Sequence, residues 1–494
     1  MNVGNVQSLS YLIPEVLLVL TIVAIFVADL VVSEKHRLGQ IALGGALLSL
    51  LALWRLAVAG TPDGWLFSRM IVHDPFALFF KVIFALAAMA AVWMSLGSKE
   101  IKNVSQGEYY GLLLSSALGM YFMASANNLL MAYLSLEFVS LTSYALSGFL
   151  RHNRRSGEAA LKYLIYGGVA SGTMIYGMSW IFGLTGSLDF AQINAALTHG
   201  DPNKLALFIA LVLTLVGFGY KISAVPFHMW APDVYTGAPI PITAFLAVGS
   251  KAAGFALLMR FFYPTISHLG ADGTWQFLPG VDWPQLVLVL CMVTMTLGNM
   301  AALSQRNLKR LLAYSSIAHA GYMLMGFVVL SNEGLRAMLF YMVVYYLMNL
   351  GAFLVVMIVA NATDREDIDG YRGLAWRGGA APAVAMAIFM FSLTGLPPLA
   401  GFIGKFYLFA AVIRQQFYFL ALVGVLNSVI SLYYYARIVR TMFLDFPDGT
   451  EAPVTVSAHN GALMWGLSAA TLAMGVYWAP VIAFADRSLR FFMG

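Results

Sequence analysis

Long apolar stretches recur along the whole of this chain of 494 residues. Each is about 20 residues long, which is the length of α-helix that crosses the hydrocarbon core of a bilayer. Because lipid offers the backbone no hydrogen-bond partner, such a stretch must be helical in a membrane. The chain is therefore predicted to be an all-α polytopic membrane protein with about fourteen transmembrane helices. These are expected near residues 11–31, 38–58, 75–96, 109–126, 129–149, 159–182, 204–225, 239–262, 284–303, 311–330, 336–360, 381–413, 416–440 and 460–484.

The composition supports this class and excludes others. Hydrophobic residues make up 60% of the chain and charged residues 10%, which excludes an ordinary soluble globule. A single cysteine, Cys291, excludes a disulfide or a cysteine-ligated iron–sulfur cluster within one chain. No phosphate-binding loop is present, since Gly404-Lys405 is followed by Phe406 inside an apolar run. We therefore expect neither a metal nor another cofactor in this chain.

Basic residues gather in loops on one side of the expected bundle. By the positive-inside rule these loops are cytoplasmic, which places both termini on the opposite face. The asymmetry explains the net charge of +5 without a nucleic-acid partner. The basic residues of these loops are Lys35, His36, Arg37, Lys99, Lys102, Arg151, Arg154, Arg155, Arg306, Lys309, Arg310, Arg365, Arg372 and Arg377.

Two blocks of similar length suggest an internal duplication. Residues 109–262 (helices 4–8) and 284–440 (helices 9–13) each have a proline-interrupted helix as their fourth member. Because each block has an odd number of spans, a tandem copy enters the membrane upside down, as in many transporters. We expect two inverted five-helix repeats, preceded by helices 1–3 in 1–108 and followed by helix 14 in 441–494.

Three lysines lie inside apolar runs, at Lys221, Lys251 and Lys405. A lysine at the centre of a membrane helix costs about 2.5–3.5 kcal/mol, so its presence there indicates a function in ion transfer. Two of the runs are broken by proline, which removes a backbone donor and frees the carbonyl four residues earlier. Pro226 thus frees the carbonyl of Ile222. Pro397 and Pro398 likewise free those of Leu393 and Thr394, and each freed carbonyl needs a partner.

Glu137 is the expected partner of Lys221. It lies in the middle of its span with no other formal charge nearby in the sequence, and a neighbouring carboxylate favours a charged lysine whereas apolar burial opposes it. The alternative is a static ion pair, although buried pairs are poor stabilisers.

Lys251 is central in its span, too far from either end to reach the surface, and is expected to relay the charge. If residues 396–401 unwind, Lys405 falls in the first turn of the following half-helix, whose positive dipole end would help it release a proton. The alternative for Lys405 is a side chain that reaches toward the membrane surface.

Further titratable residues could assist. His319 titrates near neutrality and could bridge Lys251 and Lys405, or could instead be a buried histidine bonded to a backbone carbonyl. Lys162 opens its span after Glu158 and has either an auxiliary role or a surface position. His228, just past the first break, is interpreted as structural.

Four stretches of the chain resemble the antiporter-like membrane subunits of respiratory complex I, the proton-pumping NADH:quinone oxidoreductase. They are LKYLIYGGVASG, VPFHMWAPDVYTGAPIPITAFLAVGSKAAGFAL, LKRLLAYSSIAHAGYMLMG and GLPPLAGFIGKFYLF, and the resemblance spans roughly 75–440. Within the family, PDVYTGAPIPITAFLAVGSK is similar to the N type. The M type carries glutamate where this chain has Lys405, and the L type has a long C-terminal lateral helix.

The resemblance carries over the family's key residues to Glu137, Lys162, Lys221, Lys251 and Lys405. It implies that this chain moves protons while NADH, FMN, iron–sulfur clusters and quinone are bound by partner subunits. The implied partners are the K- and M-type neighbours and the lateral helix of the L-type subunit, in a bacterial inner membrane with periplasmic termini. A second hypothesis is that the chain is a subunit of an Mrp-type cation/proton antiporter. A third hypothesis is that it is a mainly structural spacer.

Overall fold

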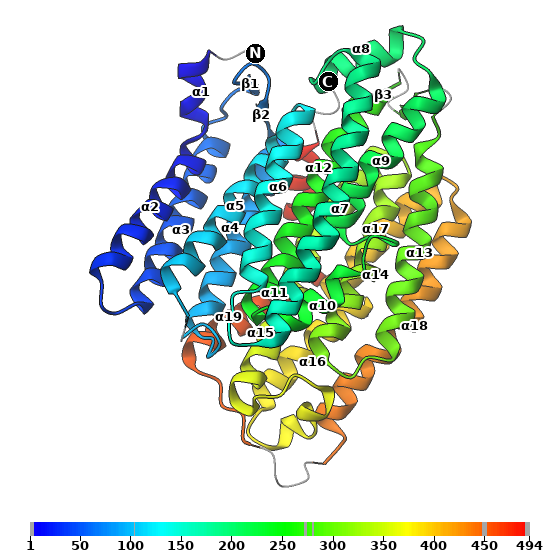
Figure 1. Cartoon of the computed structure of the whole chain (residues 1–494). Helices are drawn as coiled ribbons and strands as arrows, with labels where there is room; N and C mark the ends of the chain where they lie inside the picture. Colours follow the sequence, from blue (N-terminus) through cyan, green and yellow to red (C-terminus); the bar gives the residue numbers. More distant parts are fainter. Residues whose placement is uncertain (1–3, 103, 271–273, 279–280, 447–451, 490–494) are drawn as a thin grey trace.

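The chain forms a bundle of long helices that run roughly along one direction (Figure 1). A computed structural model describes residues 4–102, 104–270, 274–278, 281–446 and 452–489. The helices of the first half are α1 (Asn5–Tyr11), α2 (Ile13–Val31), α3 (His36–Val58), α4 (Pro75–Leu96), α5 (Gln106–Ser125), α6 (Leu129–Ser147), α7 (Arg154–Thr185), α8 (Phe190–His199), α9 (Lys204–Ile222), α10 (Trp230–Gly237), α11 (Ile240–Phe245) and α12 (Lys251–Ile266). Those of the second half are α13 (Trp283–Leu303), α14 (Leu308–Val328), α15 (Asn332–Thr363), α16 (Ala380–Thr394), α17 (Ala400–Arg414), α18 (Tyr418–Phe443), α19 (Ala458–Val476) and α20 (Ala479–Ser488).

Ten helical segments within the described ranges are long and apolar enough to cross a membrane. Two sharply bent pairs, Ile368–Trp376 with Ala380–Thr394 and Ala458–Val476 with Ala479–Ser488, raise the number to twelve if each is one span. The predicted class, a polytopic helical membrane protein, is confirmed. The count of fourteen and the inverted relation between 109–262 and 284–440 stay predictions, as do the four-part division of the chain and the orientation of termini whose outermost residues lie outside the described ranges.

The two ends of the bundle differ in structure. One end carries two short antiparallel hairpins, β1 (Gly64–Leu66) with β2 (Ile71–His73) and β3 (Ser267–Leu269) with β4 (Trp275–Phe277). Helix α8 lies at this same end (Figure 1). The opposite end carries the basic loops and two 3-10 turns, η2 (Ile368–Tyr371) and η3 (Leu374–Trp376).

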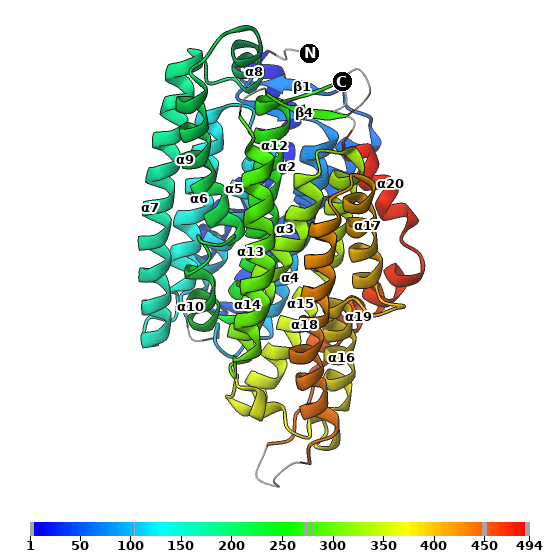
Figure 2. The same ribbon diagram turned by 90° about the vertical axis from the view of Figure 1, so that its right-hand side faces the viewer.

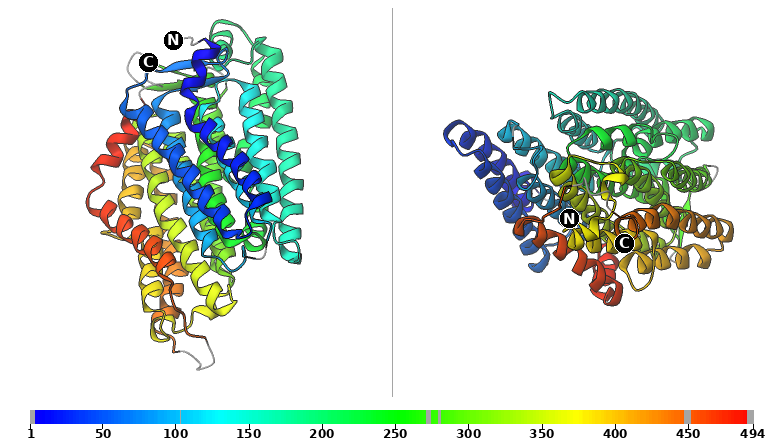
Figure 3. Two further views of the ribbon diagram at one scale, coloured as in Figure 1. Left: turned by 90° about the vertical axis from the view of Figure 1, so that its left-hand side faces the viewer. Right: turned by 90° about the horizontal axis from the view of Figure 1, so that it is seen from below.

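The middle of the bundle is formed by α11–α12, α14 and α15. The apolar windows of these segments are 100%, 94% and 89% buried, whereas that of α2 is 22% buried. Helices α2 and α3 lie at one edge (Figure 3), and α19 and α20 lie against the side (Figure 2). Charged groups in the middle helices are therefore shielded from lipid by protein on all sides.

Three helices near the middle of the bundle are irregular. Helix α9 ends at Ile222 because Ser223 adopts a left-handed conformation (φ 60°), and α10 begins only at Trp230. Helix α16 ends at Thr394, where Gly395 has φ 92°, and α17 begins at Ala400. Between α11 and α12 lies a π-helical turn, η1 (Leu246–Ser250), which the sequence analysis does not foresee.

Two buried ion pairs outside the expected path also went unpredicted. Arg260 on α12 donates two hydrogen bonds of 2.7 Å to the Asp74 carboxylate, which also caps α4 by accepting from the amide of Ala77. The ammonium of Lys81 on α4 lies 2.6 Å from Glu15 on α2. In both pairs a carboxylate compensates the buried cation directly.

Candidate functional site

Lys221 lies in the last turn of α9, at the first helix break. Its side chain is 1% exposed and its Nζ donates to Ser140 Oγ on α6 at 3.1 Å. The C-terminal end of a half-helix carries partial negative charge, which favours a cation at this place. The break therefore supplies part of the stabilisation that a buried lysine requires.

Glu137 lies one helical turn before Ser140 on α6. It is within electrostatic range of Lys221, but the ion pairs found among the described residues within 4.0 Å do not include this one. One oxygen of Glu137 is buried without a hydrogen-bond partner, which leaves a position that water can fill. The expected direct contact is thus replaced by contact with the serine of the next turn, and the two charges influence each other across a gap.

Lys251 directly follows the π-turn η1 and is 2% exposed. Its Nζ donates to the backbone oxygen of Ser316 at 2.7 Å and also contacts Ser316 Oγ. One turn later, Gly254 lies so close to α9 that an added Cβ would be 3.2 Å from Lys221 Cγ. The helix that carries Lys251 is therefore packed directly against the stem of Lys221.

His319 lies three residues after Ser316 on α14 and is hydrogen-bonded to two tyrosines. Its Nδ1 is 2.7 Å from Tyr341 Oη and its Nε2 is 3.2 Å from Tyr435 Oη, and the latter hydroxyl is 2.5 Å from Ser315 Oγ. The alternative of a histidine bonded to a backbone carbonyl is not what the geometry shows. Lys251 contacts Ser316, one turn before His319 on α14, and Lys405 lies over the ring of Tyr322, one turn after it, so the two lysines flank the histidine along the helix.

Lys405 lies in the second turn of α17, not the first as expected, because the break occupies only 395–399. Its ammonium donates to the carbonyl oxygen of Thr394 at 2.9 Å and to Ser428 Oγ at 3.1 Å, and lies 4.5 Å from the ring centre of Tyr322. The side chain is 4% exposed. The expected position of Lys405 in the first turn of the half-helix is therefore wrong. Its ammonium is held instead by a carbonyl at the end of α16.

Lys162 is placed differently from Lys221, Lys251 and Lys405. It lies on α7 with 38% of its side chain exposed, and its Nζ is 2.7 Å from both Glu158 and Asp233. Asp233 on α10 also pairs with Arg310 at 2.5 Å. Lys162 thus ties α7 to the second half of the broken helix. The sequence analysis did not predict a role for Asp233. The signal available in the sequence was a carboxylate only seven residues after Pro226.

Several buried polar groups near the lysines have no hydrogen-bond partner. Both amide atoms of Asn349 are in this state, and the side chain is fully buried. The ring of Tyr345, one turn away on α15, is 5.2 Å from that of His319. Buried polar atoms of this kind are ordinarily satisfied by internal water. Ser223 and His228 Nδ1 also belong to this set, whereas the buried hydroxyls of Tyr163, Tyr235 and Tyr345 lie close to serine side chains.

The described residues contain no group of three or more His, Cys, Asp or Glu side chains suited to a metal ion. The geometry is instead a row of buried titratable groups on helices α6, α9, α12, α14 and α17. Hydroxyl and carbonyl groups contact the three lysines, and hydroxyl groups contact His319; such groups can orient or relay a proton without carrying charge themselves.

Comparison with known proteins identifies the family of the chain. Residues 126–431 match the family described as NADH:quinone oxidoreductase/Mrp antiporter, TM. The chain is 46% identical to NADH-quinone oxidoreductase subunit N of Anaeromyxobacter sp. (strain Fw109-5), with 99% of this chain and 98% of the relative covered. It is similar to a chain of respiratory complex I from Thermus thermophilus with bound aureothin, at 32% identity and a TM-score of 0.79, covering 96% of this chain and 100% of that one.

A chain of the Mrp complex from Dietzia sp. DQ12-45-1b has a TM-score of 0.80 at 20% identity, covering 99% of this chain and 98% of that one. At such identity the likeness shows the fold alone. The chain belongs to the antiporter-like membrane subunits shared by NADH:quinone oxidoreductase and Mrp antiporters, and within them to the group of NADH-quinone oxidoreductase subunit N.

Proposed function

We propose that Glu137, Lys221, Lys251, His319 and Lys405 form the proton path of this chain, which is a proton-translocating membrane subunit of respiratory complex I. One observation carries the proposal: the three lysines of the path are buried and are held by neutral groups. Lys221 contacts Ser140, Lys251 contacts Ser316, and Lys405 contacts Thr394 and Ser428.

A lysine compensated by a carboxylate is locked in its charged form, whereas one held by hydroxyl and carbonyl groups can lose its proton when the local field changes. The contrast with Lys81 and Arg260, each paired with a buried carboxylate, supports this distinction. The neutral surroundings of the three lysines suit groups that gain and lose a proton. The carboxylate partners of Lys81 and Arg260 suit cations that stay charged and stabilise the fold.

The energy for transport comes from outside this chain in the proposed scheme. Moving one proton against 100 mV costs about 2.3 kcal/mol. Quinone reduction in partner subunits, which also hold the NADH, FMN and iron–sulfur sites, supplies it. Glu137 receives the signal, and each charge shift alters the proton affinity of the next group, from Lys221 to Lys251 and through His319 to Lys405. Lys162 acts as an auxiliary through its contact with Asp233.

The proposed setting is a bacterial inner membrane with both termini periplasmic and the basic loops cytoplasmic. The K- and M-type subunits are the proposed neighbours, and the lateral helix of the L-type subunit is a further contact. The alternative, a subunit of an Mrp-type cation/proton antiporter, has the fold in its favour. The full-length identity to relatives named subunit N favours complex I.

A tagged copy of the chain tests the proposal. It should co-purify with flavin and iron–sulfur subunits, and the complex in proteoliposomes should acidify the lumen when NADH is oxidised. Lys251→Met should stop this acidification while reduction of an artificial electron acceptor continues. Sodium-dependent proton exchange without flavin subunits would favour the Mrp alternative, and normal pumping by Lys251→Met would exclude the proposed path.

A further inference from the structure

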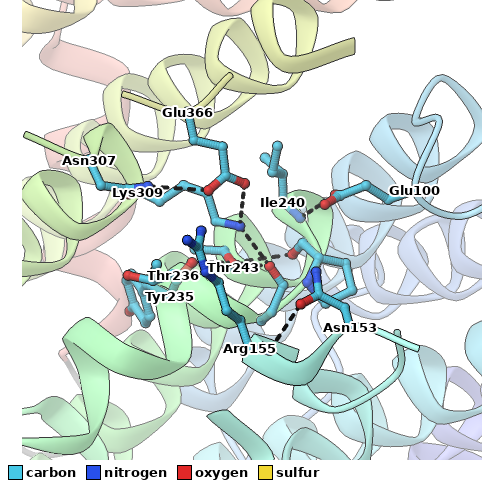
Figure 4. Close-up of polar contacts among 12 residues, drawn as sticks. Glu100, Asn153, Arg155, Tyr235, Thr236, Ile240, Thr243, Asn307, Lys309 and Glu366 are labelled. Atoms are coloured by element: carbon cyan, nitrogen blue, oxygen red, sulfur yellow. Dashed lines mark hydrogen bonds and ion pairs between the residues drawn. The ribbon is translucent and has the colours of Figure 1, made fainter. Parts of the chain in front are cut away.

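A cavity of about 560 Å³ opens at the end of the bundle that carries the basic loops. Three of its lining residues stand out: Glu100 from the loop after α4, Lys309 at the start of α14, and Glu366 from the loop after α15 (Figure 4). Other charged side chains that line it are Lys99, Arg155, Arg306, Asp364, Arg365 and Asp367. None of these residues belongs to the path proposed above.

Lys309 is the most buried of the three, with 2% of its side chain exposed. Its Nζ lies 2.9 Å from Glu366 Oε1 and 2.9 Å from the carbonyl oxygen of Ala238. Ala238 belongs to the short linker between α10 and α11. The lysine therefore joins the inner wall of the cavity to the segment that leads to Lys251.

Glu100 holds the same linker from the other side. Its Oε2 accepts a hydrogen bond of 2.9 Å from the amide of Ile240, the first residue of α11 (Figure 4). Burial raises the pKa of this carboxyl group above its ordinary value, as does nearby Glu366, while Lys309 and the Ile240 amide act in the opposite direction. Glu100 is thus a carboxyl group in contact with a cavity that opens to solvent, and able to hold a proton.

Helix α14 carries both Lys309, in the wall of the cavity, and Ser316, in contact with Lys251. Lys309 and Ser316 are seven residues apart, which places them on one face of the helix about 10.5 Å apart along its axis. Ser316 is the residue that holds Lys251. On neighbouring α10, the buried hydroxyl of Tyr235 lies close to the Ser316 side chain. A short chain of water and hydroxyl groups is enough to span this interval.

We propose that Glu100 takes up the proton destined for Lys251, and that Lys309 controls its passage, an assignment that rests on the path proposed above. A proton from water on the side of the basic loops binds the Glu100 carboxylate and neutralises it. Lys309 then loses one of two facing negative charges. The proton leaves Glu100 through water and hydroxyl groups for the unprotonated amine of Lys251, which becomes charged as the Glu100 carboxylate is restored.

The alternative is a purely structural role, in which Glu100 only caps α11. The two roles predict opposite rankings of the pumping rates of two variants. Glu100→Gln keeps an oxygen for the Ile240 amide but cannot carry a proton. Glu100→Asp keeps the acid but shortens the reach to the amide. If Glu100 carries protons, the aspartate variant pumps better than the glutamine variant; if it is only a cap, the order is reversed.

The experiment uses the whole complex in proteoliposomes, with lumen acidification and artificial-acceptor reduction measured across a pH series. Glu108→Gln is the matched control, because Glu108 lies near the same end with half its side chain exposed and pairs with Arg151. We expect Glu100→Gln to slow pumping at least about tenfold, as for loss of a proton-transfer group. Glu100→Asp should recover much of the rate with a shifted pH profile, and Glu108→Gln should match the wild type.

Lys251→Met, measured in parallel, separates the two proposals. If it stops pumping while Glu100→Gln pumps like Glu108→Gln, the uptake role of Glu100 is wrong and the central path stands. If Lys251→Met also pumps normally, the central path fails first. A Glu100→Asp variant that pumps less well than Glu100→Gln assigns Glu100 to capping and overturns its uptake role.

Discussion

The ammonium group of Lys405 lies 2.9 Å from the carbonyl oxygen of Thr394, the carbonyl that Pro398 deprives of its helical donor. The lysine takes the place of the missing backbone amide. When Lys405 is uncharged, its amine remains a donor, so the broken helix can stay closed in both protonation states. Lys405 therefore has two roles: it satisfies the carbonyl freed at the helix break, and it is a titratable group of the proposed path.

Lys405→Met keeps the length of the side chain but removes both the donor and the titratable group. We expect proton pumping to fall at least about tenfold, because a relay group that cannot change charge blocks transfer. Lys405→Glu leaves a protonatable group with the opposite sign, so some transfer should survive. The measurement is lumen acidification in proteoliposomes, and normal pumping by Lys405→Met would move the exit path away from this residue, with His319 the next candidate.

Lys221→Ala should abolish or sharply lower pumping and quinone-coupled NADH oxidation, while artificial-acceptor reduction continues. The reason is its place at the first break, where Ser140 is its only hydrogen-bond partner among the described residues. Lys204→Ala is the control, since Lys204 begins the same helix and is exposed. An assembled Lys221→Ala complex that pumps at wild-type stoichiometry would exclude a role in the path.

Glu137→Gln should weaken pumping less than Lys221→Ala does. Glu137 acts on Lys221 across a gap, so a neutral side chain leaves the lysine able to titrate but removes its tuning. The two variants are compared by pumping rate and by the amount of assembled complex. Equal and complete loss of assembly in both would instead support a static electrostatic pair.

His73 on β2 should make the protein sensitive to acid. Burial, with the nearby ammonium of Lys81, lowers the pKa of His73 from 6.5 to about 4, while Asp74 raises it. Because the folded state disfavours the charged ring, the unfolded chain binds more protons as pH falls from about 6.5 to 4, and stability decreases across that window. The effect is on the order of 3 kcal/mol at most.

His73→Gln keeps a group that can bond to Thr61 Oγ1, which lies 2.9 Å from the ring in the native protein. The variant should lose less thermal stability than the wild type between pH 6.5 and 4. His152→Gln, at an exposed histidine of the opposite end, should behave like the wild type. Identical acid sensitivity in all three proteins would show that His73 does not titrate as described.

Sequence reasoning located the helix breaks and the lysines Lys221, Lys251 and Lys405 because the physics of each is local. Proline cannot donate, and a lysine in an apolar run is costly wherever the run folds. For the same reason the sequence predicted that the Thr394 carbonyl would need a hydrogen-bond partner. It did not predict that this partner would be Lys405. The direct contact between Glu137 and Lys221 was expected from charge alone, and packing placed Ser140 there instead.

The contacts that escaped prediction join segments far apart in the chain. Arg260 meets Asp74 across 186 residues, and Lys309 meets Glu366 across 57. Loop residues such as Glu100 carry no periodicity that marks them as buried. Such pairings depend on which helices become neighbours, and a single sequence does not specify this.

The π-turn before Lys251 makes the direction of this lysine depend on how the preceding five residues wind. Each residue of an α-helix turns the following side chains by about 100°, and a π-turn accommodates a residue that regular winding does not. Substitutions that let Leu246–Ser250 wind as a regular α-helix, with no residue removed, would swing the lysine by about a quarter-turn away from Ser316. The span would remain as apolar and as long as a membrane requires, so a hydropathy profile would register nothing while the proton relay lost its alignment.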